Sequence, residues 1–152
     1  MGATLKSRQR ILVVEDDESM AEFISTVLVH DGYRVASAHT VEVGLIDFRN
    51  VAYNLVIMDL FMDGMGGIEG ISRLVEMNKK VPIIAISAGY KNMTPNEALA
   101  AAKKVGATAV LPKPIEAKAL IEIVTGALDK KNSAAKSSRR PGRFIQNMRG
   151  IY

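Results

Sequence analysis

Short apolar runs alternate with longer amphipathic segments over most of the chain, and this alternation constrains the fold more than any other feature. Val, Ile and Leu dominate the runs, as is typical of strands buried on both faces of a parallel sheet. The expected strands are 11–14, 33–37, 55–58, 83–86 and 109–111. Because a helical segment follows each strand, the sequence predicts an α/β fold with helices on both faces. Half of a barrel would alternate in the same way, but 152 residues favour an open, doubly wound, five-stranded parallel sheet.

Capping residues and apolar spacing predict where the helices begin and which side chains they bury. Asp17 or Ser19 can cap the first helix, and Thr94, Pro95 and Glu97 form a capping box at the start of the fourth. The expected buried stripe of the first helix is Met20, Phe23, Ile24, Val27 and Leu28. In the second helix, which begins at Thr40, the expected buried residues are Val43, Ile46 and Phe48. The expected stripe of the third helix is Ile68, Ile71, Leu74 and Val75.

Composition excludes several classes of protein. The chain has no Cys, so it can hold neither disulfides nor Cys-ligated zinc or iron–sulfur groups. No apolar run approaches the roughly 18 residues of a membrane span, and only residues 11–14 follow the basic start, which is too short for a signal peptide. We therefore expect a cytoplasmic protein. Seven of the 20 Lys and Arg lie in 130–152, which holds none of the 16 acids, so 1–129 has a net charge of −3.

Charged and hydroxyl side chains stand at the ends of four of the expected strands. Glu15, Asp16 and Asp17 follow the first strand, Asp59 the third, Ser87 the fourth and Lys113 the fifth. Taken alone, Asp59 would be a turn or helix-capping residue. In a parallel sheet, however, these strand ends meet at one edge, where several carboxylates repel one another unless a cation such as Mg²⁺ joins them. A lysine and a hydroxyl beside them suit a phosphoryl group, and a carboxylate can accept it as an acyl phosphate.

These motifs together resemble the receiver domain of two-component response regulators. The resemblance covers about residues 9–129 and implies a flavodoxin-like (βα)5 fold with strand order 2-1-3-4-5. Asp59 matches the phosphoacceptor, charged by a histidine kinase or a phosphotransfer protein. Ser87 matches the switch hydroxyl and Lys113 the phosphate-binding lysine. By the same resemblance Asp16 would bind Mg²⁺ directly and Glu15 usually through water, and Asp59 and the backbone carbonyl of Phe61 would be further ligands. Asp17 is interpreted as a helix-start residue.

The sequence departs from the family pattern at positions that concern signalling. Met62 is followed by Asp63, where the family usually has Pro; Asp63 can cap the third helix or add negative charge near the site. The aromatic switch position, three residues before the lysine, holds Val110. We hypothesise that Tyr90, in a loop longer than is common, replaces the missing ring. The reporting surface implied by the resemblance is the fourth helix, fifth strand and fifth helix.

The ends of the chain differ in composition from its middle. We expect a short basic arm at 1–10, a receiver at 11–129, and a basic tail at 130–152. The fifth helix should run from Ile115 to near Lys130, after which the linker-like composition predicts mobility. The end of the tail spaces Phe144, Met148, Ile151 and Tyr152 among basic residues. It can dock on a protein, contact an acidic membrane or nucleic acid through charge, or act only as a solubilising tail.

Four classes of function remain to be weighed. The favoured one is a stand-alone receiver, a switch rather than an enzyme, which binds a protein target or relays phosphate. The alternative is a pseudo-receiver, a binding module that signals without phosphate. An aspartyl-phosphate phosphatase of the haloacid dehalogenase type is disfavoured because it needs an acid two residues after the nucleophile, where this chain has Phe61. A DNA-binding regulator is disfavoured because no helix-turn-helix is visible.

Overall fold

Five parallel strands form one sheet in the order β2-β1-β3-β4-β5, which confirms the predicted fold class. The computed structural model describes residues 5–62, 64–88 and 93–138, with side chains as far as residue 132. The strands are β1 (Arg10–Val14), β2 (Arg34–Ala38), β3 (Leu55–Asp59), β4 (Ile83–Ser87) and β5 (Ala109–Pro112). The helices are α2 (Glu18–His30), α3 (Val41–Asn50), α4 (Gly67–Met77), α5 (Pro95–Lys104) and α6 (Ala117–Ser138).

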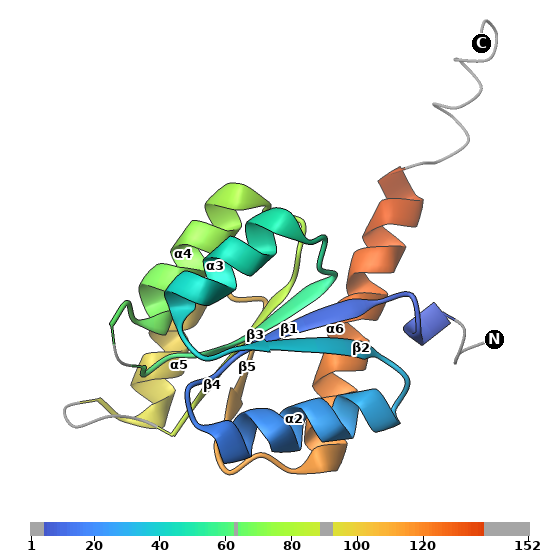
Figure 1. Ribbon diagram of the computed structural model, residues 1–152. Helices are drawn as coiled ribbons and strands as arrows, with labels where there is room; N and C mark the ends of the chain where they lie inside the picture. Colours follow the sequence, from blue (N-terminus) through green and yellow to red (C-terminus); the bar gives the residue numbers. More distant parts are fainter. Residues whose placement is uncertain (1–4, 63, 89–92, 139–152) are drawn as a thin grey trace, which may run out of the picture.

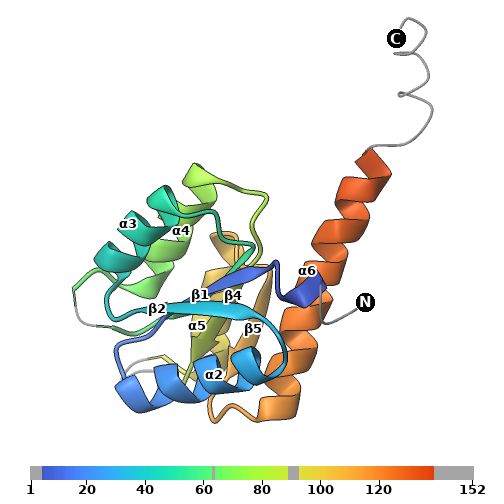
Figure 2. The same ribbon diagram turned by 45° about the vertical axis from the view of Figure 1, so that its right-hand side comes forward.

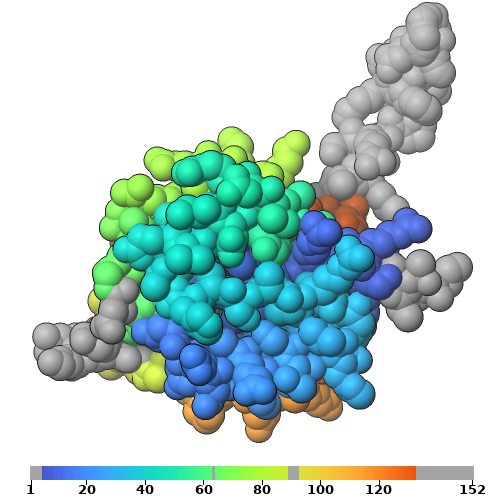
Figure 3. Space-filling view, in the orientation of Figure 1, coloured from blue at the N-terminus to red at the C-terminus, as the bar shows by residue number. Residues whose placement is uncertain are grey.

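Helices cover both faces of the sheet (Figure 1). Side chains of α3, α4 and α5 pack with one face, and side chains of α2 and α6 pack with the other. Turning the molecule shows the same two layers on opposite sides of the strands (Figure 2). The central strands β3 and β4 are buried at every position, as continuous apolar strands require. In the space-filling view the surface of α2 (blue) lies below that of α3 (teal), with the region of the edge strand β2 (cyan) between them (Figure 3).

Local sequence signals set most helix starts as expected. Asp17 caps α2, its carboxylate accepting hydrogen bonds from the backbone amides of Ser19 and Met20. The capping box of α5 is complete: Thr94 Oγ1 accepts from the backbone N–H of Glu97 at 3.1 Å, and the Glu97 carboxylate accepts from that of Thr94 at 2.9 Å. The predicted caps of α2 and α5 are therefore confirmed, because in both helices a side-chain oxygen accepts hydrogen bonds from the first turn.

The predicted buried face of the second helix is wrong. Val43 and Ile46 are 47% and 52% exposed, whereas Val41, Gly44 and Leu45 are buried. The helix is rotated because Gly44 lets it approach the sheet: a Cβ there would lie 2.9 Å from Cγ2 of Val14. The prediction used the spacing of apolar side chains only, and so it did not count Gly44 as part of the buried face. In α2, likewise, Phe23 is 38% exposed while Ala21 is buried.

The last helix is longer than its composition predicted. The expected end near Lys130 is wrong, because α6 continues to Ser138. Its start is at Ala117, two residues after the expected Ile115. The far end of α6 projects beyond the sheet (Figures 1 and 2). Residues 139–152 lie outside the described part of the chain, so the role predicted for the end of the tail stays a prediction.

Candidate functional site

The carboxyl ends of β1 and β3 bring two buried carboxylates together. Glu15 directly follows β1, and Asp59 is the last residue of β3; these strands are neighbours in the sheet. Glu15 is 0% exposed and Asp59 4%, whereas Asp16 is exposed. One carboxylate oxygen from each of Glu15, Asp16 and Asp59 lies within 4.8 Å of the others. The three acids can thus converge on one cation, and an all-oxygen set suits Mg²⁺.

Lys113 reaches both buried acids from the end of β5, the strand at one side of the sheet. It follows β5, and its Nζ lies 3.0 Å from Oε1 of Glu15 and 3.5 Å from Oδ2 of Asp59. Burial lowers the pKa of Lys113, but the charges of Asp59 and Glu15 outweigh this and raise it overall. The ammonium therefore keeps its charge beside Glu15 and Asp59, and it can also meet a group attached to Asp59.

The environment of Asp59 favours its neutral form. Burial raises the pKa of Asp59 from 3.8 to about 7, and hydrogen bonding and repulsion from Glu15 act in the same direction. Lys113 and the backbone amide of Phe61 lower the pKa of Asp59, but they do not outweigh burial. A bound cation would favour the charged form of Asp59 over its neutral form.

Ser87 completes the site from β4. It is fully buried at the end of that strand, and Asp59 pairs with the preceding residue, Ile86. The backbone carbonyl of Ser87 accepts a hydrogen bond from the backbone N–H of Lys113 at 2.9 Å, which ties the two strand ends together. The sheet therefore gathers at one edge the carboxylates, the hydroxyl and the lysine expected at the ends of four strands. Their individual roles stay predictions.

Two further residues near the acids have distinct positions. Asp17 is engaged as the helix cap described above, which agrees with its interpretation as a helix-start residue. Phe61 donates its backbone N–H toward the Asp59 carboxyl. That its carbonyl contacts a metal remains a prediction.

Glu42 fixes the loop that follows Asp59, and the sequence analysis did not identify it. Its Oε2 accepts a hydrogen bond from the backbone N–H of Met65 at 3.3 Å and so joins α3 to the loop after β3. The partners are 23 residues apart and no short-range spacing marks such a contact. At the N-cap of α4 stands Gly66, which has no capping side chain. Asp63, the expected cap, lies outside the described residues.

The structure describes Val110, the residue at the expected aromatic position, but not Tyr90, the residue proposed to replace the missing ring. Val110 lies on β5, partly buried against the core side that α3, α4 and α5 share. An aliphatic side chain therefore occupies the position where the resemblance led us to look for a ring. Tyr90 lies outside the described residues.

Comparison with known proteins identifies relatives. Residues 11–125 match the response regulator receiver domain family. The chain is 35% identical over 121 residues to the DNA-binding response regulator MtrA of Mycobacterium tuberculosis, covering 80% of this chain and 51% of the relative. It is 30% identical over 118 residues to the uncharacterized transcriptional regulatory protein YkoG of Bacillus subtilis, covering 78% and 50%. The chain thus spans about half the length of these curated relatives.

Solved structures agree with the fold. A CheY-like response regulator receiver domain protein from Methanospirillum hungatei superposes with a TM-score of 0.77 at 25% identity, covering 83% of this chain and 98% of that one. The chemotaxis protein CheY4 of Vibrio cholerae gives a TM-score of 0.71 at 25% identity, covering 78% and 98%. None of the described helices is long and apolar enough to cross a bilayer.

Proposed function

The chain belongs to the response regulator receiver domain family, and from this premise we propose that it is a switch that accepts a phosphoryl group on Asp59. The observation that carries the proposal is the position of Lys113 Nζ, 3.0 Å from Glu15 and 3.5 Å from Asp59, two of the three acids that converge at the strand ends. The family supports a histidine kinase or a phosphotransfer protein as the donor. Receiver domains are signalling domains, so the chemistry serves to change the state of the protein.

The proposed reaction transfers a phosphoryl group between two residues. A carboxylate oxygen of Asp59 attacks the phosphorus of a phosphohistidine, a P–O bond forms, and the P–N bond breaks with its electron pair left on the imidazole. Lys113 then pairs with the new phosphoryl oxygens in place of its contact to the free carboxylate. Ser87 is the hydroxyl proposed to donate to one of these oxygens. Hydrolysis ends the signal when water attacks phosphorus and releases inorganic phosphate, restoring Asp59.

The acidic residues beside Asp59 fit a resident cation. Glu15, Asp16 and Asp59 would hold Mg²⁺, with the carbonyl of Phe61 as a further proposed ligand, and the ion would neutralise charge on the transferring oxygens. Glu15 also holds Lys113 in place through the 3.0 Å ion pair.

We further propose that a protein target reads the switch on the surface formed by α5, β5 and α6. The backbone hydrogen bond from Lys113 to Ser87 links the phosphoryl site directly to the end of β5. Because Val110 replaces an aromatic ring, the change must pass through the backbone of this strand or through another side chain, for which Tyr90 is our candidate.

The test is to expose the protein to a small phosphoryl donor. Wild type, Asp59→Asn and Asp129→Asn are incubated with Mg²⁺ and either acetyl phosphate or beryllofluoride, and intact mass and amide NMR spectra are recorded. We expect one added phosphoryl group in wild type and in the Asp129→Asn control, and none in Asp59→Asn. Beryllofluoride should shift amides in α5, β5 and α6; shifts confined to the loops around Asp59 would contradict the proposed reporting surface.

A phosphorylation-independent pseudo-receiver is the alternative function, and Val110 is the observation that favours it. This reading predicts neither added mass nor altered amides in wild type, even with Mg²⁺ present. The single-domain arrangement is also part of our proposal. Since the curated relatives are about twice as long as the matched region, we would compare the native protein in source cells with the mass expected for 152 residues.

A further inference from the structure

The edge of the sheet opposite Asp59, where the strands begin, is lined by basic residues. Three hollows follow one another along it. The first lies at the starts of β2, β1 and β3, the second between β3 and β4, and the third before β4 and β5. The first and second share Ala52, and the second and third share Val81. Together they form one row, which we call the basic edge.

The first hollow, of about 540 Å³, is lined by three arginines. Arg10 and Arg34 are direct neighbours in the register of β1 and β2, and Arg8 precedes them. Like charges placed side by side on adjacent strands are unfavourable unless an anion lies between them. A guanidinium binds phosphate oxygens with two parallel hydrogen bonds, so this arrangement suits phosphate groups.

The third hollow, of about 250 Å³, is lined by four lysines. Lys79 and Lys80 come from the turn after α4, and Lys130 and Lys131 from α6, at and just past the end expected for this helix. Lys131 is half-buried, and burial lowers its pKa because no acidic partner compensates for lost hydration.

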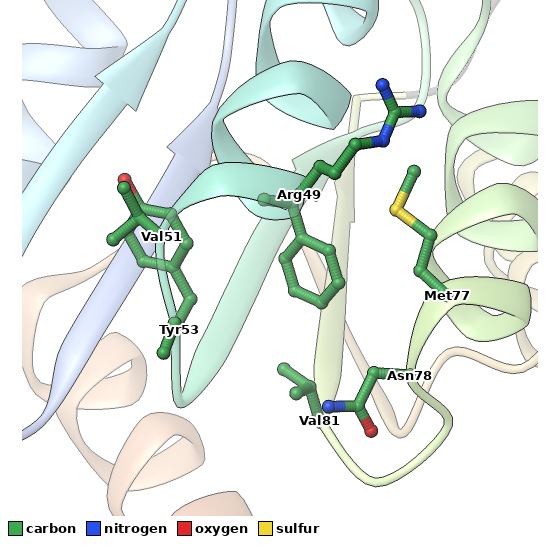
Figure 4. A pocket seen from close by; sticks show the side chains of 8 residues that line it. Arg49, Val51, Tyr53, Met77, Asn78 and Val81 are labelled. Atoms are coloured by element: carbon green, nitrogen blue, oxygen red, sulfur yellow. The ribbon is translucent and has the colours of Figure 1, made fainter.

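The middle hollow, of about 380 Å³, combines one cation with apolar and aromatic walls. Figure 4 shows Val51 and Tyr53 on one side, across from Met77, Asn78 and Val81. Arg49 adds a positive charge, and the ring of Phe48 also lines the space. Charged hollows thus flank a central one that can accept a flat, weakly polar group.

The charges of the basic edge are uncompensated within the described part of the chain. Eight cations line the three hollows and no described Asp or Glu does. None of the eight forms an ion pair with a described residue. The sheet is about 19 Å wide across five strands, so the row is long enough for several nucleotides of an extended chain.

We propose that the basic edge binds single-stranded nucleic acid, with phosphates along the arginine and lysine hollows and a base in the central one. Duplex DNA fits less well, because the row runs across strand starts, turns and parts of α3, α4 and α6, and no single recognition element carries it into a groove. A bilayer fits less well because the aromatic groups lie within hollows: Tyr53 is only 8% exposed and cannot insert among lipids. An acidic peptide would satisfy the charges but not the central hollow.

This site is independent of the proposed phosphorylation of Asp59, which lies at the opposite ends of the strands. Asp59→Asn should leave nucleic-acid binding unchanged, and variants of the basic edge should still accept a phosphoryl group. Failure of one proposal is therefore distinguishable from failure of the other.

The test is fluorescence anisotropy of a labelled 12-nucleotide single strand of mixed sequence with the full-length protein between 50 and 200 mM salt. The comparison ligands are the same sequence as a duplex, linear polyphosphate of similar charge, a 12-residue polyglutamate and vesicles with acidic lipid. We expect the single strand to bind tightest, with a slope of log affinity against log salt of about −3 to −5, from about 0.7 per phosphate contact.

Two double variants each remove two charges from the row: Arg10→Gln with Arg34→Gln, and Lys79→Gln with Lys130→Gln. All four side chains are exposed, so the variants should keep the wild-type fold. Thermal unfolding and the response to beryllofluoride would check this. The matched control, Lys118→Gln with Arg73→Gln, removes two exposed cations that line none of the hollows. Each edge variant should bind about tenfold more weakly and reduce the slope by about 1.4, whereas the control should change affinity less than twofold.

Other results would overturn the proposal. If both edge variants bind the nucleic acid as tightly as wild type does, the binding is due to the charge of residues 133–152 and not to the basic edge. If the control weakens binding as much as the edge variants, the attraction is general. Tighter binding of duplex, polyglutamate or vesicles would assign the edge to a different partner, and equal binding of polyphosphate would remove the role given to the central hollow.

Discussion

Burial determines the protonation of Asp59 before any phosphoryl donor is involved. Its pKa of about 7 means that the folded protein holds this proton far more tightly than the unfolded chain, where the ordinary value is 3.8. Below about pH 4 both states are protonated and the difference has no effect on stability. As pH rises toward 7 the unfolded state loses its proton first, so the free energy of unfolding decreases, and above pH 7 the full penalty applies.

We therefore predict that Asp59→Asn stabilises the metal-free protein at high pH. Because the substitution also removes the ion pair of Asp59 with Lys113, we expect a gain of about 1 to 2 kcal/mol at pH 8, below the full value of the pKa shift. The gain should vanish near pH 4. Urea unfolding in EDTA at pH 4, 6 and 8 measures it; an equal effect at all three pH values would show that the charge of Asp59 is not its cause.

Gly67 is the residue whose size matters most beside the site. Its backbone N–H donates to the carbonyl of Leu60 at 3.0 Å, and a Cβ at this position would lie 2.7 Å from the Cα of Leu60. Gly126 is the opposite case: it lies within α6, and a Cβ there would meet nothing within 4 Å. The two glycines thus form a matched pair.

We predict that Gly67→Ala lowers the free energy of unfolding by about 2 to 3 kcal/mol, because the backbone next to Asp59 must move. Gly126→Ala should raise it by about 0.5 to 1 kcal/mol through helix propensity alone. Urea unfolding at pH 7 compares both with wild type. A neutral Gly67→Ala would mean that the start of α4 adjusts freely and that the close approach to β3 is not required.

At the level of elements, α5 depends on its capping box. Thr94 and Glu97 satisfy one another's backbone amides at the start of this helix, which is part of the proposed reporting surface. Thr94→Ala should destabilise the protein by about 1 kcal/mol, with amide hydrogen exchange accelerated in α5 and unchanged in α2. Thr26→Ala, on the exposed side of α2, is the control. Uniform acceleration in all helices would instead indicate that α5 unfolds only with the whole domain.

The elements also show where sequence reasoning succeeds. Strands and capped helix starts were predictable because their signals are local: β3 is a continuous apolar run, and Asp17 or Thr94 lies within three residues of the amides it caps. The buried face of α3 was not, since it depends on how closely Gly44 lets the helix approach Val14. The extent of α6 was also missed, because its polar composition resembles that of a linker.

At the scale of the whole molecule, topology explains why the site residues could be grouped from the sequence. In a parallel sheet all strands end at one edge, so Glu15, Asp59, Ser87 and Lys113 had to meet there once the strands were assigned. The contact from Glu42 to Met65 and the basic edge could not be grouped in this way. Apart from Arg10 and Arg34, which begin β1 and β2, the charged residues involved come from turns and helices, whose positions depend on packing and not on strand order.

The convergence of three acids at the strand ends makes the stability of the whole protein depend on both metal binding and pH. A cation among Glu15, Asp16 and Asp59 must displace the proton that burial keeps on Asp59, so metal binding and protonation compete. Any ligand that binds only the folded state raises its stability in proportion to the logarithm of ligand concentration over Kd. Mg²⁺ should therefore stabilise the protein strongly above pH 7 and weakly near pH 5.

We predict that 10 mM Mg²⁺ raises Tm by several degrees at pH 8, corresponding to about 1 to 3 kcal/mol, and by much less at pH 5. Asp16→Asn should abolish most of this shift, because it removes the exposed member of the trio without disturbing the Glu15–Lys113 ion pair. Asp129→Asn should retain it. Calorimetry with Mg²⁺ and with matched NaCl separates binding from general screening, and a pH-independent shift would mean that the ion binds outside the trio.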